Sequence, residues 1–233
     1  MGFPATRHSV VQAVAHADPE VRRRAWDALA ALYWPPVRAY LRLKWRLGAE
    51  DAEDLAQAFF ARALEKGFLD GYEPARGRFR TDLRTCLDGF VSNERAAAAR
   101  LKRGGGSVHV PLEGDVAAGS AEADPEACFH REWVRSLFGQ ALLALRAEAE
   151  AHGRQAALRA FERYDLDGPE EWERPTYAGL AAELDLPVTQ VTNHLAAMRR
   201  AFRRHVLEVL RSACASEEEF RAEARDLLGV EPA

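Results

Sequence analysis

TYAGLAAEL-DLP-VTQVTNHLAAMRRAFRRHVLEVLR, residues 176–211, carries the strongest structural signal in the chain. Thr176 suits a helix N-cap, and apolar residues keep one face through the first segment. Pro187 suits the first turn of a helix but not its interior, so we expect a second helix to begin at Pro187 or Val188. Apolar residues then recur every three or four positions as far as Val209. The stretch predicts a short helix, a tight turn and a long helix.

The polar side of the expected long helix changes in side-chain type along its length. Short polar side chains at its start suit contacts with base edges, and arginines further along suit phosphates. Because helix-turn-helix spacing is only moderately specific, the alternative is a solvent-exposed basic face on an ordinary helical hairpin. The candidate DNA contacts of this recognition helix are Gln190, Thr192, Asn193, His194, Arg199, Arg200 and Arg203.

Composition predicts an all-α protein. The 233 residues suffice for two small domains, and alanine, leucine, arginine and glutamate dominate without β-branched runs of period two. The net charge of -4 argues against a uniformly basic surface. Charge is instead segregated: residues 78–103 hold seven bases and three acids, whereas residues 113–126 hold five acids and no base. We therefore expect separate basic and acidic faces.

Catalytic and metal-binding patterns are lacking. Cys86, Cys128 and Cys214 are scattered, without a close Cys or His partner, so we expect reduced thiols and no metal, cofactor or disulfide. The seven histidines are dispersed, and no nucleophile motif accompanies them. A helical enzyme, the alternative here, would need a clustered site. No stretch resembles a signal peptide or a membrane span, and we expect a cytoplasmic protein without membrane insertion.

Four further helices are expected before residue 104. The first begins after an N-cap at Asp18 with Pro19 in its first turn, and we expect residues 33–36, YWPP, to separate it from a second helix that carries Val37, Tyr40 and Leu41. The third, from GAEDAEDLAQAFFARALEKGF, has an acidic exposed side with Asp51, Glu53, Asp54 and Gln57. The fourth, from residue 78 to the glycines at 104–106, is basic. Its polar side is formed by Arg80, Arg84, Asn93, Arg95, Arg100, Lys102 and Arg103.

The second half of the chain begins with a linker. Glycine, serine, alanine and acids dominate residues 104–125, a composition typical of a connection between domains. Helices are expected from Pro125 onward, over 155–164, and in the tail after Ser216. We interpret the acidic tail, SEEEFRAEARDLLG, as a helix that completes the second domain, with a regulatory extension as the alternative.

Three segments in this order resemble one protein family. DAEDLAQAFFARAL, RGRFRTDLRTCLDGFVSNERAAAARLKR and TYAGLAAELDLPVTQVTNHLAAMRRAF together resemble the extracytoplasmic-function group of bacterial RNA polymerase sigma factors. The resemblance covers nearly the whole chain. It implies a sigma-2-like domain over residues 5–103, a linker over 104–125, a sigma-4-like helix-turn-helix domain over 126–213, and a C-terminal helical tail over 214–233.

The resemblance also assigns partners to the faces. It implies that Asp51, Glu53, Asp54 and Gln57 bind core RNA polymerase, that the basic helix captures the promoter -10 strand, and that the recognition helix binds the -35 duplex. It further implies a non-enzymatic factor for promoter recognition, DNA melting and transcription initiation, controlled by an anti-sigma factor or a regulatory protein kinase. The alternative is a helix-turn-helix repressor or activator that acts on promoter DNA without core polymerase.

Overall fold

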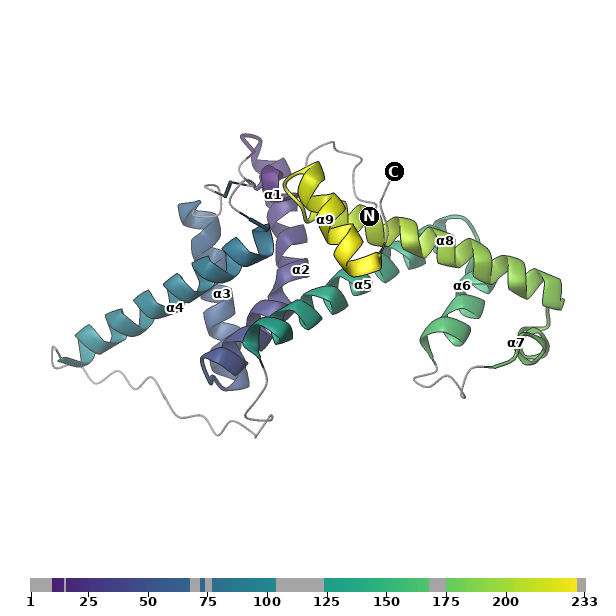
Figure 1. Cartoon of the computed structure of the whole chain (residues 1–233), viewed down its shortest axis with the longest axis horizontal. Coiled ribbons are helices and arrows are strands. Elements are labelled where there is room, and N and C mark those ends of the chain that lie inside the picture. The colour runs from purple at the N-terminus through teal and green to yellow at the C-terminus, as the bar shows by residue number, and fades with distance from the viewer. Residues whose placement is uncertain are drawn as a thin grey trace. The chain divides into compact units, whose positions relative to one another are not determined.

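The computed structural model describes residues 10–14, 16–67, 72–73, 77–103, 124–167 and 175–229. Every secondary-structure element in these residues is helical, which confirms the all-α prediction (Figure 1). In chain order the elements are α1 (Val10–Ala13), α2 (Pro19–Lys44), α3 (Ala49–Lys66), α4 (Phe79–Arg103), α5 (Pro125–Ala151), α6 (Gln155–Phe161), the π-helical segment η2 (Glu162–Leu166), α7 (Tyr177–Leu184), α8 (Val188–Ser212) and α9 (Glu217–Leu228).

The chain forms two compact units. The larger takes its described residues from Thr6–Leu137 and Leu210–Ala233, and the smaller from Phe138–Val209. Helices α5 and α8 each contribute residues to both units. The boundaries of these units differ from the boundaries of the expected domains. The start of α5 and the whole of α9 belong to the same unit as the N-terminal helices. The expected linker lies outside the described residues up to position 123.

Local sequence signals set several helix starts as predicted. The Asp18 carboxylate accepts hydrogen bonds from the backbone N–H groups of Glu20 and Val21 at the start of α2. The hydroxyls of Thr176 and Ser216 accept the N–H groups of Gly179 and Glu219 in the same way, at 3.0 and 3.1 Å. Each cap satisfies backbone donors that a helix leaves unpaired at its first turn. The N-caps predicted at Asp18 and Thr176 are confirmed.

The predicted interruption at residues 33–36 is wrong, because α2 runs without a break through Pro35 and Pro36. A proline inside a helix removes a backbone hydrogen bond and crowds the preceding turn. Packing offsets that loss here. Tyr33 and Pro36 are buried in the unit, and the Trp34 indole stacks on Phe60 of α3 with ring centroids 5.4 Å apart.

Aromatic side chains from distant segments form the core of the larger unit. Tyr33 of α2 lies edge-on to Phe79 of α4, with ring centroids 5.6 Å apart. Phe129 of α5 contacts Tyr40 edge-on at 5.8 Å and Tyr33 at 6.5 Å. Such pairs stabilise a core beyond the area that they bury. The first turns of α5 therefore belong to the core of the N-terminal helices.

Helix α9 also packs on the N-terminal helices, and not on the helix-turn-helix core as we expected. The Gln12 side-chain amide donates to the carbonyl of Ala215 at 2.6 Å, and the backbone N–H of Phe79 donates to Glu219 Oε1 at 2.8 Å (Figure 1). Phe220 is buried. The helical period of the tail predicted a buried face but not its location, since that location depends on contacts with residues far away in the sequence.

The smaller unit is built around α8. Leu195 and Met198 of α8 pack with Phe161 of α6 and Leu180 of α7 in one buried cluster. This confirms most of the predicted apolar stripe, although Val188 at its beginning is 44% exposed. On the opposite side of α8, exposed polar side chains include Gln190, Thr192, Asn193, Arg200 and Arg203.

Candidate nucleic-acid interface

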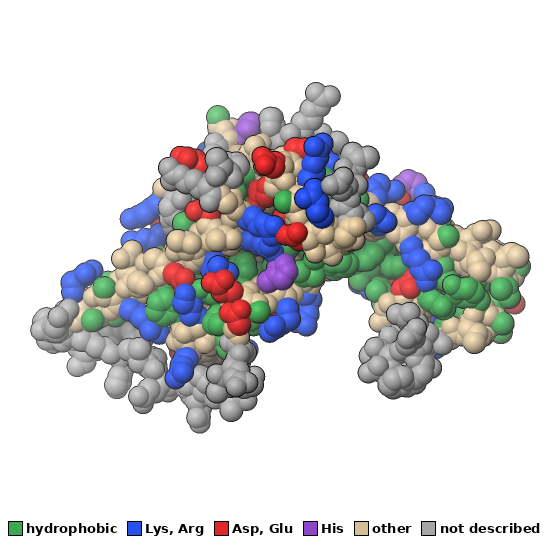
Figure 2. Space-filling model, viewed as in Figure 1, with side chains coloured by type: hydrophobic (Ala, Val, Ile, Leu, Met, Phe, Trp, Pro, Cys, Tyr) green, Lys and Arg blue, Asp and Glu red, His purple; other side chains and the backbone are tan. Residues whose placement is uncertain are grey.

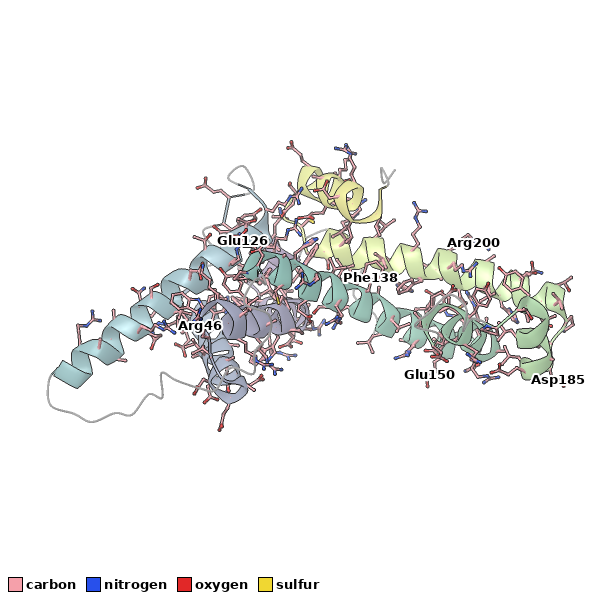
Figure 3. The ribbon with its side chains drawn as sticks, turned by 60° about the horizontal axis from the view of Figure 1, so that its bottom comes forward. Arg46, Glu126, Phe138, Glu150, Asp185 and Arg200 are labelled. Carbon is pink, nitrogen blue, oxygen red and sulfur yellow. The ribbon has the colours of Figure 1, made fainter. Side chains whose placement is uncertain are left out.

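A tight turn joins α7 to α8. Asp185 caps α7 in the left-handed conformation, with a φ of 53°, and its N–H donates to the carbonyl of Ala181. Asp tolerates this conformation better than most residues with a side chain. The next N–H, of Leu186, also donates to Ala181, at 2.9 Å. Figure 3 marks Asp185 at this turn and Arg200 further along α8.

The start of α8 presents the predicted polar side chains. Gln190, Thr192 and Asn193 are exposed, and His194 is half-buried. The Gln190 amide lies 3.3 Å from the His194 ring, and the Thr192 hydroxyl donates to the backbone carbonyl of Thr189 at 2.9 Å. Amide, hydroxyl and imidazole groups in this arrangement offer donors and acceptors of the kind that reads base edges in a major groove.

Arg199 differs from the arginines beside it. Its guanidinium makes two hydrogen bonds of 2.9 Å to the Asp165 carboxylate and lies over the Tyr164 ring at 5.3 Å. The hydrogen bonds to Asp165 raise the pKa of Arg199 above its usual value, although burial opposes this. Arg199 therefore ties α8 to η2, a role that its place in the basic pattern did not reveal. Arg200 and Arg203 are exposed.

Two arginines of the predicted -10 set are engaged inside the larger unit. Arg80 pairs with Glu223 of α9 at 3.1 Å and lies over the Trp133 ring at 4.9 Å. Arg84 pairs with Glu126 of α5 at 3.1 Å. Their side chains are only 16% and 19% exposed. Both acids come from segments beyond the expected first domain, so the sequence pattern of α4 could not show these partners.

Arg95 lies on a stacked platform at the end of α2. Its guanidinium covers the Trp45 ring at 4.6 Å and donates to the Trp45 carbonyl at 3.0 Å. Asp88 fixes this indole by accepting its N–H at 3.2 Å, and it also accepts from Tyr40 and Lys44, at 3.0 and 2.7 Å. A held indole beside a cation is the type of surface on which nucleobases stack. The sequence pattern did not indicate this role for Trp45, because the neighbours of Trp45 on α4 are distant in the chain.

The other predicted members of the basic helix lie near its C-terminal end. Asn93 and Arg100 are exposed. The side chains of Lys102 and Arg103 lie outside what the structure describes. Exposed polar groups are thus present along the second half of α4, whereas the arginines of its first half are paired.

The acidic side of α3 is only partly available to a partner. Asp54 and Gln57 are exposed and Asp51 is half-buried. Glu53 is engaged by α2, because Arg38 Nε lies 2.5 Å from its carboxylate and the Trp34 indole N–H donates to it at 3.0 Å. A basic partner would therefore meet the charges of Asp51 and Asp54 rather than that of Glu53.

The smaller unit also carries an apolar pocket of about 480 Å³. Phe138, Leu142, Phe161 and Phe202 line it, and the pair of Arg199 and Asp165 borders it. Figure 2 shows hydrophobic side chains on the surface of this part of the chain. Among the described residues of this unit, the large hydrophobic residues that are exposed are Leu143, Leu166, Tyr177 and Val188.

Comparisons with other proteins add no family assignment. No protein-family model, curated protein or solved structure matches the chain. Within the described ranges, no helix is both long enough and apolar enough to cross a membrane. Among the same residues, no three His, Cys, Asp or Glu side chains are grouped so as to hold a metal ion.

Proposed function

We propose that this chain is a sigma factor: a non-enzymatic subunit that brings core RNA polymerase to promoter DNA and assists duplex opening. The observation that carries the proposal is the exposed polar start of α8, which follows a capped turn from α7. Such a helix fits the major groove with its first residues toward the bases. Separate acidic and basic surfaces on α3 and α4 support a factor that must meet both a protein and a nucleic acid.

In this proposal α8 reads the -35 element as duplex. Gln190, Thr192 and Asn193 contact base edges, and Arg200 and Arg203 contact phosphates. Arg199 supports the helix through Asp165 instead of touching DNA. Phosphate contacts set affinity and its dependence on salt, whereas base-edge contacts set sequence preference.

The -10 strand lies along the second half of α4. Asn93, Arg95 and Arg100 are exposed there, and the Arg95 guanidinium stacks on the Trp45 ring. A cationic groove combined with an aromatic face is suited to a single strand with unstacked bases. Lys102 and Arg103 extend this basic series along the sequence.

Core polymerase docks on the acidic side of α3 in this proposal. The test is gel filtration of the chain with core RNA polymerase. We expect the wild-type chain to co-elute and the charge reversal Asp54→Arg to weaken that association at least tenfold, because rim charges steer and stabilise such contacts. Glu65→Arg, an equal charge change at another exposed position of α3, is the control and should co-elute normally. A wild-type chain that never co-elutes would rule out the sigma-factor function.

One observation favours a second function. Arg80 and Arg84 are paired within the chain, whereas the start of α8 is exposed. A repressor or activator that binds duplex DNA through α8 alone would need only that arrangement. Tight duplex binding by the chain in the absence of core polymerase, together with no co-elution, would establish this alternative.

A further inference from the structure

The N-terminal end of α4 is enclosed by a row of acids on α9. Glu219, Glu223 and Asp226 follow one another at spacings of four and three residues, and so share one face of the helix. Four residues advance a helix by about 6 Å, so the carboxylates form a line of negative charge along that face. Figure 2 shows acidic and basic side chains intermingled over this region.

Two arginines meet this row. The Glu223 carboxylate lies 3.1 Å from Arg80 Nε and 3.5 Å from Arg78 Nη1, and Asp226 pairs with the other terminal nitrogen of Arg78. The Glu223 side chain is only 3% exposed. Burial raises the pKa of its carboxyl above the ordinary value, although Arg80 and Arg78 oppose this. A buried carboxylate between two arginines neutralises cations that would otherwise attract phosphate.

Glu219 reinforces the contact through the backbone. Its carboxylate accepts the N–H of Phe79 at 2.8 Å, at the first residue of α4, and the N–H of Ala215 at 2.8 Å. Free N–H groups at a helix start are favoured sites for anions. Helix α9 therefore supplies carboxylates to both the side-chain and the backbone donors at the start of α4.

We propose that α9 is an internal acidic competitor of nucleic acid, which occupies Arg78, Arg80 and the start of α4 until a DNA strand displaces it. This inference rests on the proposed function, in which the second half of α4 binds single-stranded DNA. It assigns the same ligand to the first half of α4. With α9 in place, a strand reaches only the second half of α4. With α9 displaced, the strand gains two further cations, and the chain gains affinity for single-stranded DNA.

The first experiment measures binding of a fluorescein-labelled oligo(dT) strand by fluorescence anisotropy, without polymerase. Glu223→Gln combined with Asp226→Asn removes two charges of the row and keeps the shape of α9. We expect binding at least fivefold tighter than wild type, with the salt slope steeper by about 0.7 for each phosphate gained. Glu150→Gln combined with Glu218→Gln is the control, because it makes the same charge change at two exposed positions outside the acidic row.

Two outcomes of this experiment would overturn the proposal. Unchanged binding by the Glu223→Gln/Asp226→Asn variant would show that the acids do not compete with DNA. An equal gain in the control variant would show that only net charge matters. Circular dichroism melting of each variant verifies that it is folded at the assay temperature.

A second experiment uses the wild-type chain and needs no variant. Hydrogen exchange of residues 217–228 is compared with and without saturating oligo(dT). The proposal predicts faster exchange in α9 when the strand is bound, and unchanged or slower exchange would contradict it. Neither assay contains polymerase, so a chain that shows displacement of α9 but never co-elutes with core polymerase would retain this inference and lose the sigma-factor function.

Discussion

At the scale of single residues, the same side chain has different roles according to its partner. Arg199 and Arg200 are adjacent in the basic pattern of α8 and both are exposed, yet Arg199 is held by two hydrogen bonds to Asp165 on η2. A bidentate pair fixes the guanidinium geometry, so Arg199 acts within the fold. Arg200 keeps its charge available for a ligand.

Replacing each of these two arginines by alanine should separate the roles. We expect Arg200→Ala to weaken duplex DNA binding on all sequences and to lower the salt slope by about 0.9, with unchanged unfolding. Arg199→Ala should instead lower the free energy of unfolding by about 1 kcal/mol, a modest value because the pair is partly exposed. Anisotropy titrations at several salt concentrations and urea unfolding measure the two effects. If both variants lowered the salt slope of DNA binding equally, the two arginines would not have the different roles described above.

Glu148 gives the smaller unit a pH dependence. Its carboxylate lies 2.8 Å from His205 Nε2 and pairs with Arg204. Burial alone would raise the pKa of Glu148, but these hydrogen bonds outweigh it and place the pKa below the ordinary value of 4.5. A lowered carboxyl pKa contributes stability that is present above pH 4.5 and is lost as the pH falls through the folded-state pKa.

Glu148→Gln should therefore destabilise the protein at neutral pH but not in acid. We expect a loss of about 1.5–2 kcal/mol at pH 7, the lower part of the usual range for hydrogen bonds to a charged group because Arg204 is exposed. This loss becomes progressively smaller below pH 4.5. Thermal unfolding followed by circular dichroism across this range measures the difference. Glu150→Gln, at an exposed position of the same helix, should behave as wild type at every pH. If the stability difference between Glu148→Gln and wild type stayed constant with pH, the stabilisation by Glu148 would not come from its charge.

At the scale of elements, helix starts were predictable where a local signal determined them. Asp18, Thr176 and Ser216 cap helices through hydrogen bonds to residues two or three positions ahead, so a short window contained the information. The continuity of α2 through Pro35 and Pro36 depends on burial against other helices, which no local window contains. The same reason explains why the helical nature of α9 was predictable but its packing site was not.

The turn between α7 and α8 offers a test at this scale. Asp185→Val should lower the free energy of unfolding by about 1–2 kcal/mol, because a β-branched residue is strained at the φ of 53°. Asp185→Gly is the matched variant and should change stability by only a few tenths of that amount, since glycine adopts this conformation freely. Chemical denaturation of both proteins provides the comparison. Equal stability of the valine and glycine variants would show that the turn imposes no such constraint.

At the scale of the whole molecule, the candidate basic surfaces were predictable in part. The exposed polar start of α8 followed from periodicity, because α8 buries the apolar stripe that its sequence shows. The accessibility of α4 did not follow from its sequence. Arg78 meets Glu223, which lies 145 residues away, and such a pairing becomes visible only when the chain is folded. The modest net charge of -4 thus conceals cations that the chain itself neutralises.

The most direct test of the sigma-factor function is in vitro transcription on fragmented genomic DNA with purified core RNA polymerase. We predict discrete transcripts that require both the chain and the core enzyme, and that disappear with the Asp54→Arg variant. Transcripts that start at the same sites without the chain, or no transcription and no association with core polymerase, would contradict it.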